Sequence, residues 1–160
     1  MNQRIDPKPG SEWLPTWRPS AHQFGQQIND KLNGKRKSGH MYPALKDKNA
    51  VVMFFVAKRD QTNKPRFVTD CRFRNLAVYQ KHTPWPNIDE LIELVTAYPV
   101  WSKIDLADIY FNIGVEESSE KWNTMLTTYG KMRSRVLSQG DCNALSTGME
   151  AMLDIFKDLV

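Results

Sequence analysis

The sequence predicts an α+β fold in which helices pack on a small antiparallel sheet. Residues 51–57 form a run of β-branched and aromatic side chains that is typical of a buried strand, and residues 66–69 form a second. Apolar residues at helical spacing indicate helices over 20–38, 88–97 and 144–159. At 160 residues the chain is long enough for about one domain with its own core.

The chain begins with a proline-rich stretch. Residues 1–19 contain four prolines, which favours an extended, poorly ordered lead-in that Trp13 and Trp17 would dock onto the body. The predicted folded part is therefore 20–160, beginning with the first helix. Gly39 is suited to end that helix, because glycine readily adopts the left-handed conformation common after a helix C-terminus.

Each predicted helix has an apolar face that is expected to be buried. The residues concerned are Phe24, Ile28 and Leu32 in the first helix, Ile88, Leu91, Ile92 and Val95 in the second, and Met149, Met152, Leu153 and Phe156 in the third. Asn87 can cap the second helix, because its side-chain oxygen can accept from a backbone N–H of the first turn.

The remaining strands follow from apolar runs and turn residues. A polar turn at 58–65 joins the first two strands into a hairpin. Residues 100–106 are predicted to form a strand that carries an acid near its end. Strands near 124–128 and 132–137 flank Gly130, which marks a turn.

Charge divides unevenly along the chain. Residues 1–81 hold 16 Lys and Arg against 6 Asp and Glu, whereas residues 82–160 hold 6 against 12. This division suits a protein that binds phosphates with one part and metal ions with another, although an uneven scatter of solvated charge explains it equally well. No apolar stretch approaches the roughly 20 residues of a membrane helix, so no membrane partner is expected. The two cysteines favour an intracellular protein.

Two carboxylates are candidates for chemistry. Asp105 and Asp108 are three residues apart near the end of the predicted strand 100–106, where they could share a magnesium ion. A capping or surface pair is the more common role of an isolated D-x-x-D.

Five blocks of sequence place the candidates in a wider pattern. They are FFVAKRD (54–60), RFVTDCRFRN (66–75), HTPWPNIDEL (82–91), SKIDL (102–106) and QGDCNA (139–144). In content and order they resemble the reverse transcriptase of gypsy-type long-terminal-repeat retrotransposons, especially fungal ones. The resemblance implies a partial right-hand polymerase, with fingers and an incomplete palm, from a family of RNA-directed DNA polymerases.

The resemblance also implies roles for single residues. The expected nucleotide-binding residues are Lys58, Arg66, Asp108, Tyr110, Gln139 and Gly140. Lys58 and Arg66 would grip the triphosphate, and a guanidinium suits this because its donors match phosphate oxygens. Tyr110 would exclude a 2′-hydroxyl, its alternative being a core tyrosine. Asp70, Arg72 and Asn75 are expected to hold the fingers together.

Asp105 corresponds to the first catalytic carboxylate of the family, a magnesium ligand. The family's next block carries two adjacent aspartates, and this sequence contains no such pair. The chain is therefore expected to be truncated before that block and unable to polymerise alone. Expected partners are RNA or an RNA–DNA duplex, deoxynucleoside triphosphates, and a protein at the open edge of the palm. The alternative is a non-enzymatic nucleic-acid-binding or interaction module.

Several residues depart from the family pattern, among them Leu145 and the run 123–125, and two further departures are Ile109 and Gly148. Ile109 stands where a small residue is usual, and we expect it to crowd the nucleotide. Gly148 stands where a phenylalanine is usual, and we expect it to weaken the last helix. Such changes indicate drift after the loss of catalytic constraint.

Overall fold

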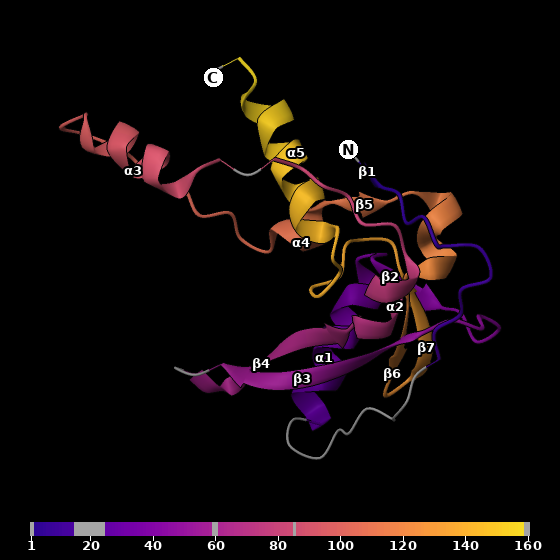
Figure 1. Cartoon of the computed structure of the whole chain (residues 1–160). Coiled ribbons are helices and arrows are strands. Elements are labelled where there is room, and N and C mark those ends of the chain that lie inside the picture. The colour runs from indigo at the N-terminus through magenta and orange to yellow at the C-terminus, as the bar shows by residue number, and fades with distance from the viewer. Residues whose placement is uncertain (1, 15–24, 59–60, 85, 159–160) are drawn as a thin grey trace.

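The computed structural model describes residues 2–14, 25–58, 61–84 and 86–158, with only the backbone of 57–58 and 61–65 (Figure 1). The helices are α1 (Gly25–Lys37), α2 (Arg72–Ala77), α3 (Ile88–Thr96), α4 (Ile109–Asn112), the 3₁₀ helix η1 (Glu117–Trp122) and α5 (Ala144–Phe156). The strands are β1 (Asn2–Gln3), β2 (Met41–Pro43), β3 (Val51–Lys58), β4 (Gln61–Asp70), β5 (Gly114–Val115), β6 (Thr124–Thr127) and β7 (Gly130–Ser134). Within these residues, no helix has the length and apolar character needed to cross a membrane.

The main sheet has five strands in the order β2-β7-β6-β3-β4. Its pairs are antiparallel except β3 with β6, which run parallel and align Val51 with Met125. The two strands predicted near 124–128 and 132–137 correspond to β6 and β7, which pair as a hairpin. Gly130, with φ +92°, follows the turn as the first residue of β7. The prediction of helices on a small sheet is confirmed, with one parallel pair that it did not include.

The hairpin of β3 and β4 is longer than predicted. The polar turn was expected to extend to residue 65, but β4 begins at Gln61 and pairs back to Lys58. Pro65 lies inside the strand, opposite Ala57 and beside a register shift. A proline is tolerated there because β4 is an edge strand of the described sheet, so its missing N–H removes few ladder bonds.

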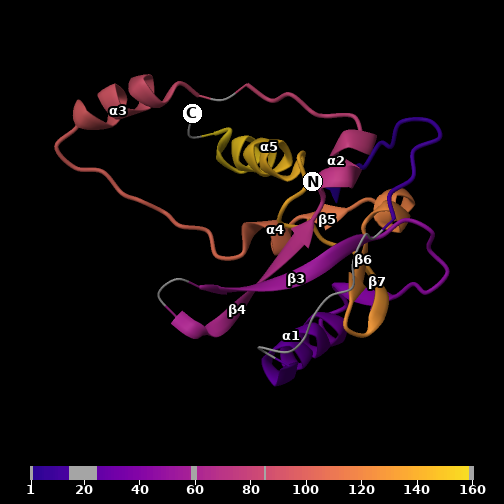
Figure 2. The same cartoon turned by 60° about the horizontal axis from the view of Figure 1, so that its bottom comes forward.

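The first core lies between α1 and the sheet (Figure 2). Ile28 and Leu32 are buried against Val51 and Met53, as their spacing predicted. Gly39 has φ +74° after the end of α1, which confirms the predicted helix stop. Phe24, the first residue of the predicted stripe, lies outside the described residues.

The second core connects the start of the chain to its end. β1 pairs with β5 in parallel, and Ile5 packs with Val78, Ile113 and Ala144. Residues 2–14 contain no helix, and buried Ile5 and Trp13 anchor them to the two cores. The predicted lead-in boundary at residue 19 and Trp17 fall in the stretch that the structure does not describe.

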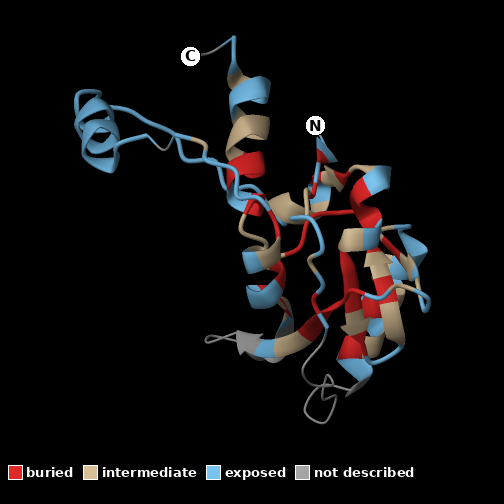
Figure 3. Ribbon diagram, turned by 45° about the vertical axis from the view of Figure 1, so that its right-hand side comes forward, coloured by how far each residue is buried: buried red, intermediate tan, exposed pale blue. Residues whose placement is uncertain are grey.

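Helix α3 is confirmed, but its apolar stripe is not buried. Asn87 caps it by accepting a hydrogen bond from the Asp89 amide at 3.0 Å. No residue of α3 is buried, and Ile88 and Ile92 are 71% and 56% exposed. The helix stands away from the body (Figure 3).

The strand predicted at 100–106 is absent: residues 101–106 have no regular structure and are exposed. The prediction was wrong because the apolar pattern does not supply a neighbouring strand. Without one among the described residues, the backbone groups of this segment have no ladder to join.

Helix α5 begins at Ala144 as predicted, and its first half is the packed half. Thr147 and Gly148 are buried, while the predicted core residue Leu153 is 53% exposed. Met149 is half-buried. Leu153 is exposed because the second half of α5 extends beyond the rest of the fold (Figure 1).

Candidate functional site

A pocket of about 700 Å³ opens between α1, β4 and the start of α4. Arg66 from β4, Asp108 before α4 and Gln139 from the loop before α5 all line it. These are three of the six predicted nucleotide-binding residues, drawn from segments distant in the sequence. The fold thus gathers half of the predicted set around one cavity.

Helix α1 supplies a wall of the pocket that sequence reasoning missed. Lys31 and Lys35 lie one helical turn apart and line the cavity, and His40 follows the helix. The i, i+4 spacing of the lysines was a usable signal. It went unused because nothing in the sequence indicated which element this face of α1 would meet.

Two aromatic rings complete the lining. The Lys35 ammonium lies 3.7 Å from the ring centroid of Phe111, and that of Lys31 lies 5.6 Å from the ring centroid of Phe67. Both rings belong to the pocket wall. A cation held over an aromatic face is attracted by the negative ring face but keeps its charge available to a nearby anion.

The charge in the pocket is predominantly positive. Lys31, Lys35 and Arg66 face one carboxylate, Asp108. Desolvation by burial lowers the pKa of Lys35, the charge of Asp108 opposes this change, and Lys31 adds to the lowering. Burial and the like charge of Lys31 thus both disfavour the charged form of Lys35. A bound anion would favour that charged form.

Asp108 stands in an unusual backbone conformation. It has φ 51° and ψ 36°, the left-handed region, and it is the only non-glycine residue with positive φ in the described part. Aspartate tolerates this conformation better than most residues. Its carbonyl accepts from the Phe111 amide at 2.8 Å, which closes the first turn of α4. This turn fixes the backbone at Asp108, whose side chain lines the pocket.

Gly140 does not line the pocket; it shapes the loop that carries Gln139. It has φ +105°, and a Cβ at this position would lie 2.6 Å from the Thr69 carbonyl oxygen. The Thr69 hydroxyl donates to the Gln139 carbonyl. The Asn75 side chain donates to the Gly140 carbonyl at 2.9 Å and accepts from the Cys142 amide at 3.1 Å. Asn75 therefore ties α2 to this loop, and its expected role in holding the fingers together stays a prediction.

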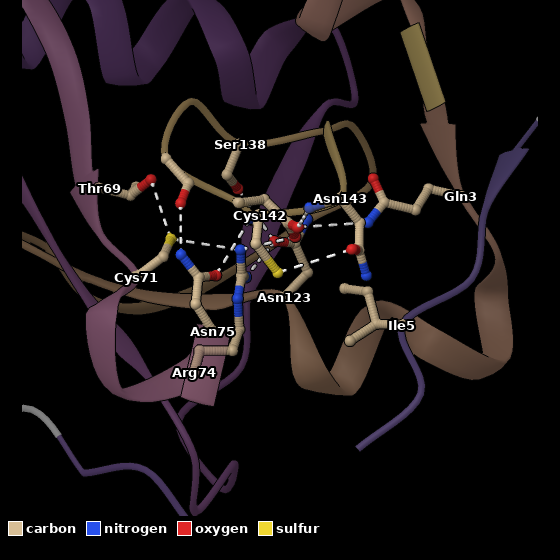
Figure 4. A network of polar contacts seen from close by, with 12 residues as sticks. Gln3, Ile5, Thr69, Cys71, Arg74, Asn75, Asn123, Ser138, Cys142 and Asn143 are labelled. Atoms are coloured by element: carbon tan, nitrogen blue, oxygen red, sulfur yellow. Dashed lines mark hydrogen bonds and ion pairs between the residues drawn. The ribbon is translucent and has the colours of Figure 1, made fainter. Parts of the chain in front are cut away.

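A buried ion pair joins α2 to this loop (Figure 4). Arg74 is fully buried and donates to the Asp141 carboxylate at 2.8 Å, to the Asn123 side-chain oxygen at 2.9 Å and to the Cys71 sulfur at 3.2 Å. Asp141 in turn accepts from the Asn143 amide at 2.8 Å. The network ties α2 to the loop that carries Gln139.

Asn123 extends the network to β7. Its side-chain amide donates to the carbonyls of Ser134 and Val136, each at 2.9 Å, and its oxygen also accepts from the Ser138 hydroxyl. Neither cysteine nearby is activated: burial raises the pKa of Cys71 and of Cys142. The raised pKa values disfavour the thiolate forms, and the hydrogen bonds of the cluster support the loop.

Two other predicted site residues, Asp105 and Tyr110, do not line the pocket. Asp105 is exposed in the irregular segment before α4. Tyr110 is half-buried and packs against the second core, which is the alternative placement considered for it. Lys58 ends β3, and its side chain is outside the described part. Their predicted roles stay predictions.

The described residues do not gather the carboxylates that a pair of magnesium ions would need. No three His, Cys, Asp or Glu side chains come together as a metal-holding group among the residues that the structure describes. Asp105 alone offers too few oxygen ligands for two ions, which need shared carboxylates.

Comparison with solved structures gives the class of fold. The chain matches part of a solved structure described as a foamy viral protease–reverse transcriptase in complex with double-stranded DNA, with a TM-score of 0.71, 18% identity and 96% of this chain covered. The fold is therefore that of a reverse transcriptase segment.

A curated protein is similar in sequence as well. An RNA-directed DNA polymerase homolog from Oenothera berteroana is 27% identical over 90 residues, which are 56% of this chain and 63% of that protein. The two matches support a relationship to reverse transcriptases. No family model matches the chain. The matched regions span less than two thirds of the curated relative and 26% of the viral chain.

Proposed function

We propose that this chain is the fingers and the first part of the palm of a reverse transcriptase of the gypsy-type, fungal-like retrotransposon class. One observation carries the proposal: Arg66, Asp108 and Gln139, which the resemblance assigns to nucleotide binding, line one cationic pocket. The five sequence blocks and the two reverse-transcriptase matches support it. Two free cysteines suit the intracellular location of such an enzyme.

The proposed ligands are deoxynucleoside triphosphates and an RNA or RNA–DNA duplex. Arg66 would hold phosphate oxygens with paired N–H donors, and Gln139 would contact the nucleotide. Asp105 would be the catalytic carboxylate of the larger active site. The residues that the structure describes gather no group of three metal-binding side chains, and the sequence has no pair of adjacent aspartates; we therefore propose that these 160 residues do not polymerise alone.

Primer extension on an RNA template with magnesium tests this proposal. The 160-residue protein and its Asp105→Asn variant should both incorporate no nucleotide above background. Incorporation by the unmodified chain that the Asp105→Asn change abolishes would overturn the proposed inactivity and would assign catalysis to Asp105.

The alternative is a nucleic-acid-binding module without chemistry. The charge distribution favours it, since the first 81 residues carry ten more basic than acidic side chains, 16 against 6. Binding of a labelled RNA–DNA duplex should then weaken steeply as salt rises, because phosphate contacts release counterions. A duplex affinity that does not change with salt concentration would contradict this alternative.

The resemblance places the open edge of the palm at the segment that carries Asp105, which is exposed. We propose this edge as the place where a protein partner packs. A change in elution volume when such a partner is added would support it, and an unchanged volume would not.

A further inference from the structure

We propose that Lys31 and Lys35 of α1 bind the polyphosphate of a nucleoside triphosphate, acting with Arg66 across the pocket; this inference rests on the proposed function. Neither lysine belongs to a matched sequence block. Both belong to the pocket wall, on the face of α1 that adjoins β4 and α4.

The contacts of Lys35 show an ammonium with an incomplete set of partners. It lies 3.7 Å from the ring centroid of Phe111, and Asp108 is the carboxylate that favours its charge. A ring face attracts the cation but accepts no strong hydrogen bond. An ammonium has three N–H donors, and phosphate oxygens would satisfy them with charge-assisted bonds.

Lys31 stands one helical turn before Lys35, so the two like charges repel. Arg66 faces the same cavity from β4. The three cations that line the cavity give it a positive potential that attracts an anion. A triphosphate carries enough negative charge to interact with all three at once.

The shape of the pocket favours a mononucleotide over a polynucleotide strand. About 700 Å³ is within the usual range for a small-molecule site. Phe67 and Phe111 add apolar surface to its wall, as is usual for a small-molecule site. Arg36 and Lys37, which line a different hollow with Tyr42, contribute no charge to this one.

The test measures binding of a fluorescent deoxynucleoside triphosphate to the full chain by anisotropy, without added metal. Lys31→Gln and Lys35→Gln should each raise the dissociation constant about tenfold, as expected for the loss of a charge-assisted bond. Lys35→Arg should restore most of the affinity. Lys37→Gln is the matched control, since it removes the same charge from the same helix and should change affinity less than about twofold.

The outcomes separate the inference from the function on which it rests. If the unmodified chain binds the triphosphate and both glutamine variants bind it equally well, the assignment of the two lysines is wrong, but the proposed nucleotide binding is supported. If the unmodified chain binds no triphosphate, the proposed function fails too. If the variants lose affinity for a labelled RNA–DNA duplex but not for the triphosphate, the lysines serve the nucleic acid and the inference is overturned. Equal thermal midpoints show that lost affinity does not come from unfolding.

Discussion

Ile109 and Gly148 face each other where α4 meets α5: a Cβ at Gly148 would lie 3.9 Å from the Ile109 Cδ1 atom. The branched side chain packs over the buried glycine, so a large residue on one helix meets a small one on the other. Ile109 does not line the pocket, so it does not crowd a ligand there as expected. The two departures from the family pattern are thus one packing arrangement, which weakens their interpretation as drift.

Gly148→Ala should stabilise the protein by about 0.5–1 kcal/mol, because alanine is the better residue in a helix interior. The added methyl group would meet Ile109 at an ordinary contact distance, so no clash offsets the gain. Urea unfolding measures the change as a higher midpoint with an unchanged slope. Gly34→Ala in α1 is the control for propensity alone, since a Cβ there meets no atom within 4 Å. A lower midpoint for Gly148→Ala would contradict the packing described.

Arg74→Met should cost about 3–5 kcal/mol of unfolding free energy, because it leaves the buried Asp141 carboxylate without its charge partner. Arg72→Met is the control on the same short helix. It breaks an ion pair with Asp70 in which the arginine side chain is 81% exposed, so the stability should barely change. Chemical denaturation of the two variants compares them directly. Similar losses from both would show that the burial of Arg74 is not what matters.

Local patterns in the sequence were enough to predict most of the helices and strands. The stop at Gly39, the cap at Asn87 and the turn at Gly130 are set by backbone chemistry within a few residues, so they could be predicted. The strand at 100–106 could not, because a strand depends on a partner elsewhere in the chain. The docking of residues 2–14 depends in the same way on β5, which is more than 100 residues away.

The candidate site was predicted in part for a similar reason. Arg66, Asp108 and Gln139 were found through motifs, and they converge. Lys31 and Lys35 carry no motif, and their importance comes only from the packing of α1 beside β4. The buried Arg74 looked like one of many surface arginines, since burial of a charge follows from the tertiary partners that neutralise it.

The exposed apolar stripe of α3 should contribute little to stability. Leu91→Gln combined with Val95→Gln should change the unfolding free energy by no more than about 0.5 kcal/mol, since these side chains are 43% and 41% exposed. Binding of a hydrophobic surface dye should fall, because the exposed patch becomes polar. Leu32→Gln in the first core is the contrasting change and should be strongly destabilising. A large loss from the α3 double variant would mean that the stripe is packed.

Stability should depend on acid through Asp47. The Arg133 guanidinium donates to both of its carboxylate oxygens, at 2.7 and 2.5 Å, and the Thr124 hydroxyl also donates to it. Hydrogen bonding by Arg133 is the main reason that the pKa of Asp47 is lowered from its usual 3.8. Because the folded pKa is the lower one, this stabilisation is fully present above pH 3.8 and is lost as the pH falls through the folded value.

Asp47→Asn should therefore lower the unfolding free energy at pH 7 by about 1–2 kcal/mol, the value of hydrogen bonds to a charged group. As the pH falls from 3.8 through the lower folded pKa, the gap between variant and unmodified protein should narrow, because the carboxyl group becomes neutral first in the unfolded and then in the folded state. Thermal midpoints measured from pH 7 to pH 2.5 test this. Asp30→Asn is the control, since Asp30 is exposed on α1 and bonds only to Gln26 among the hydrogen bonds described. A gap for Asp47→Asn that stays constant down to pH 2.5 would show that the ion pair with Arg133 is not its cause.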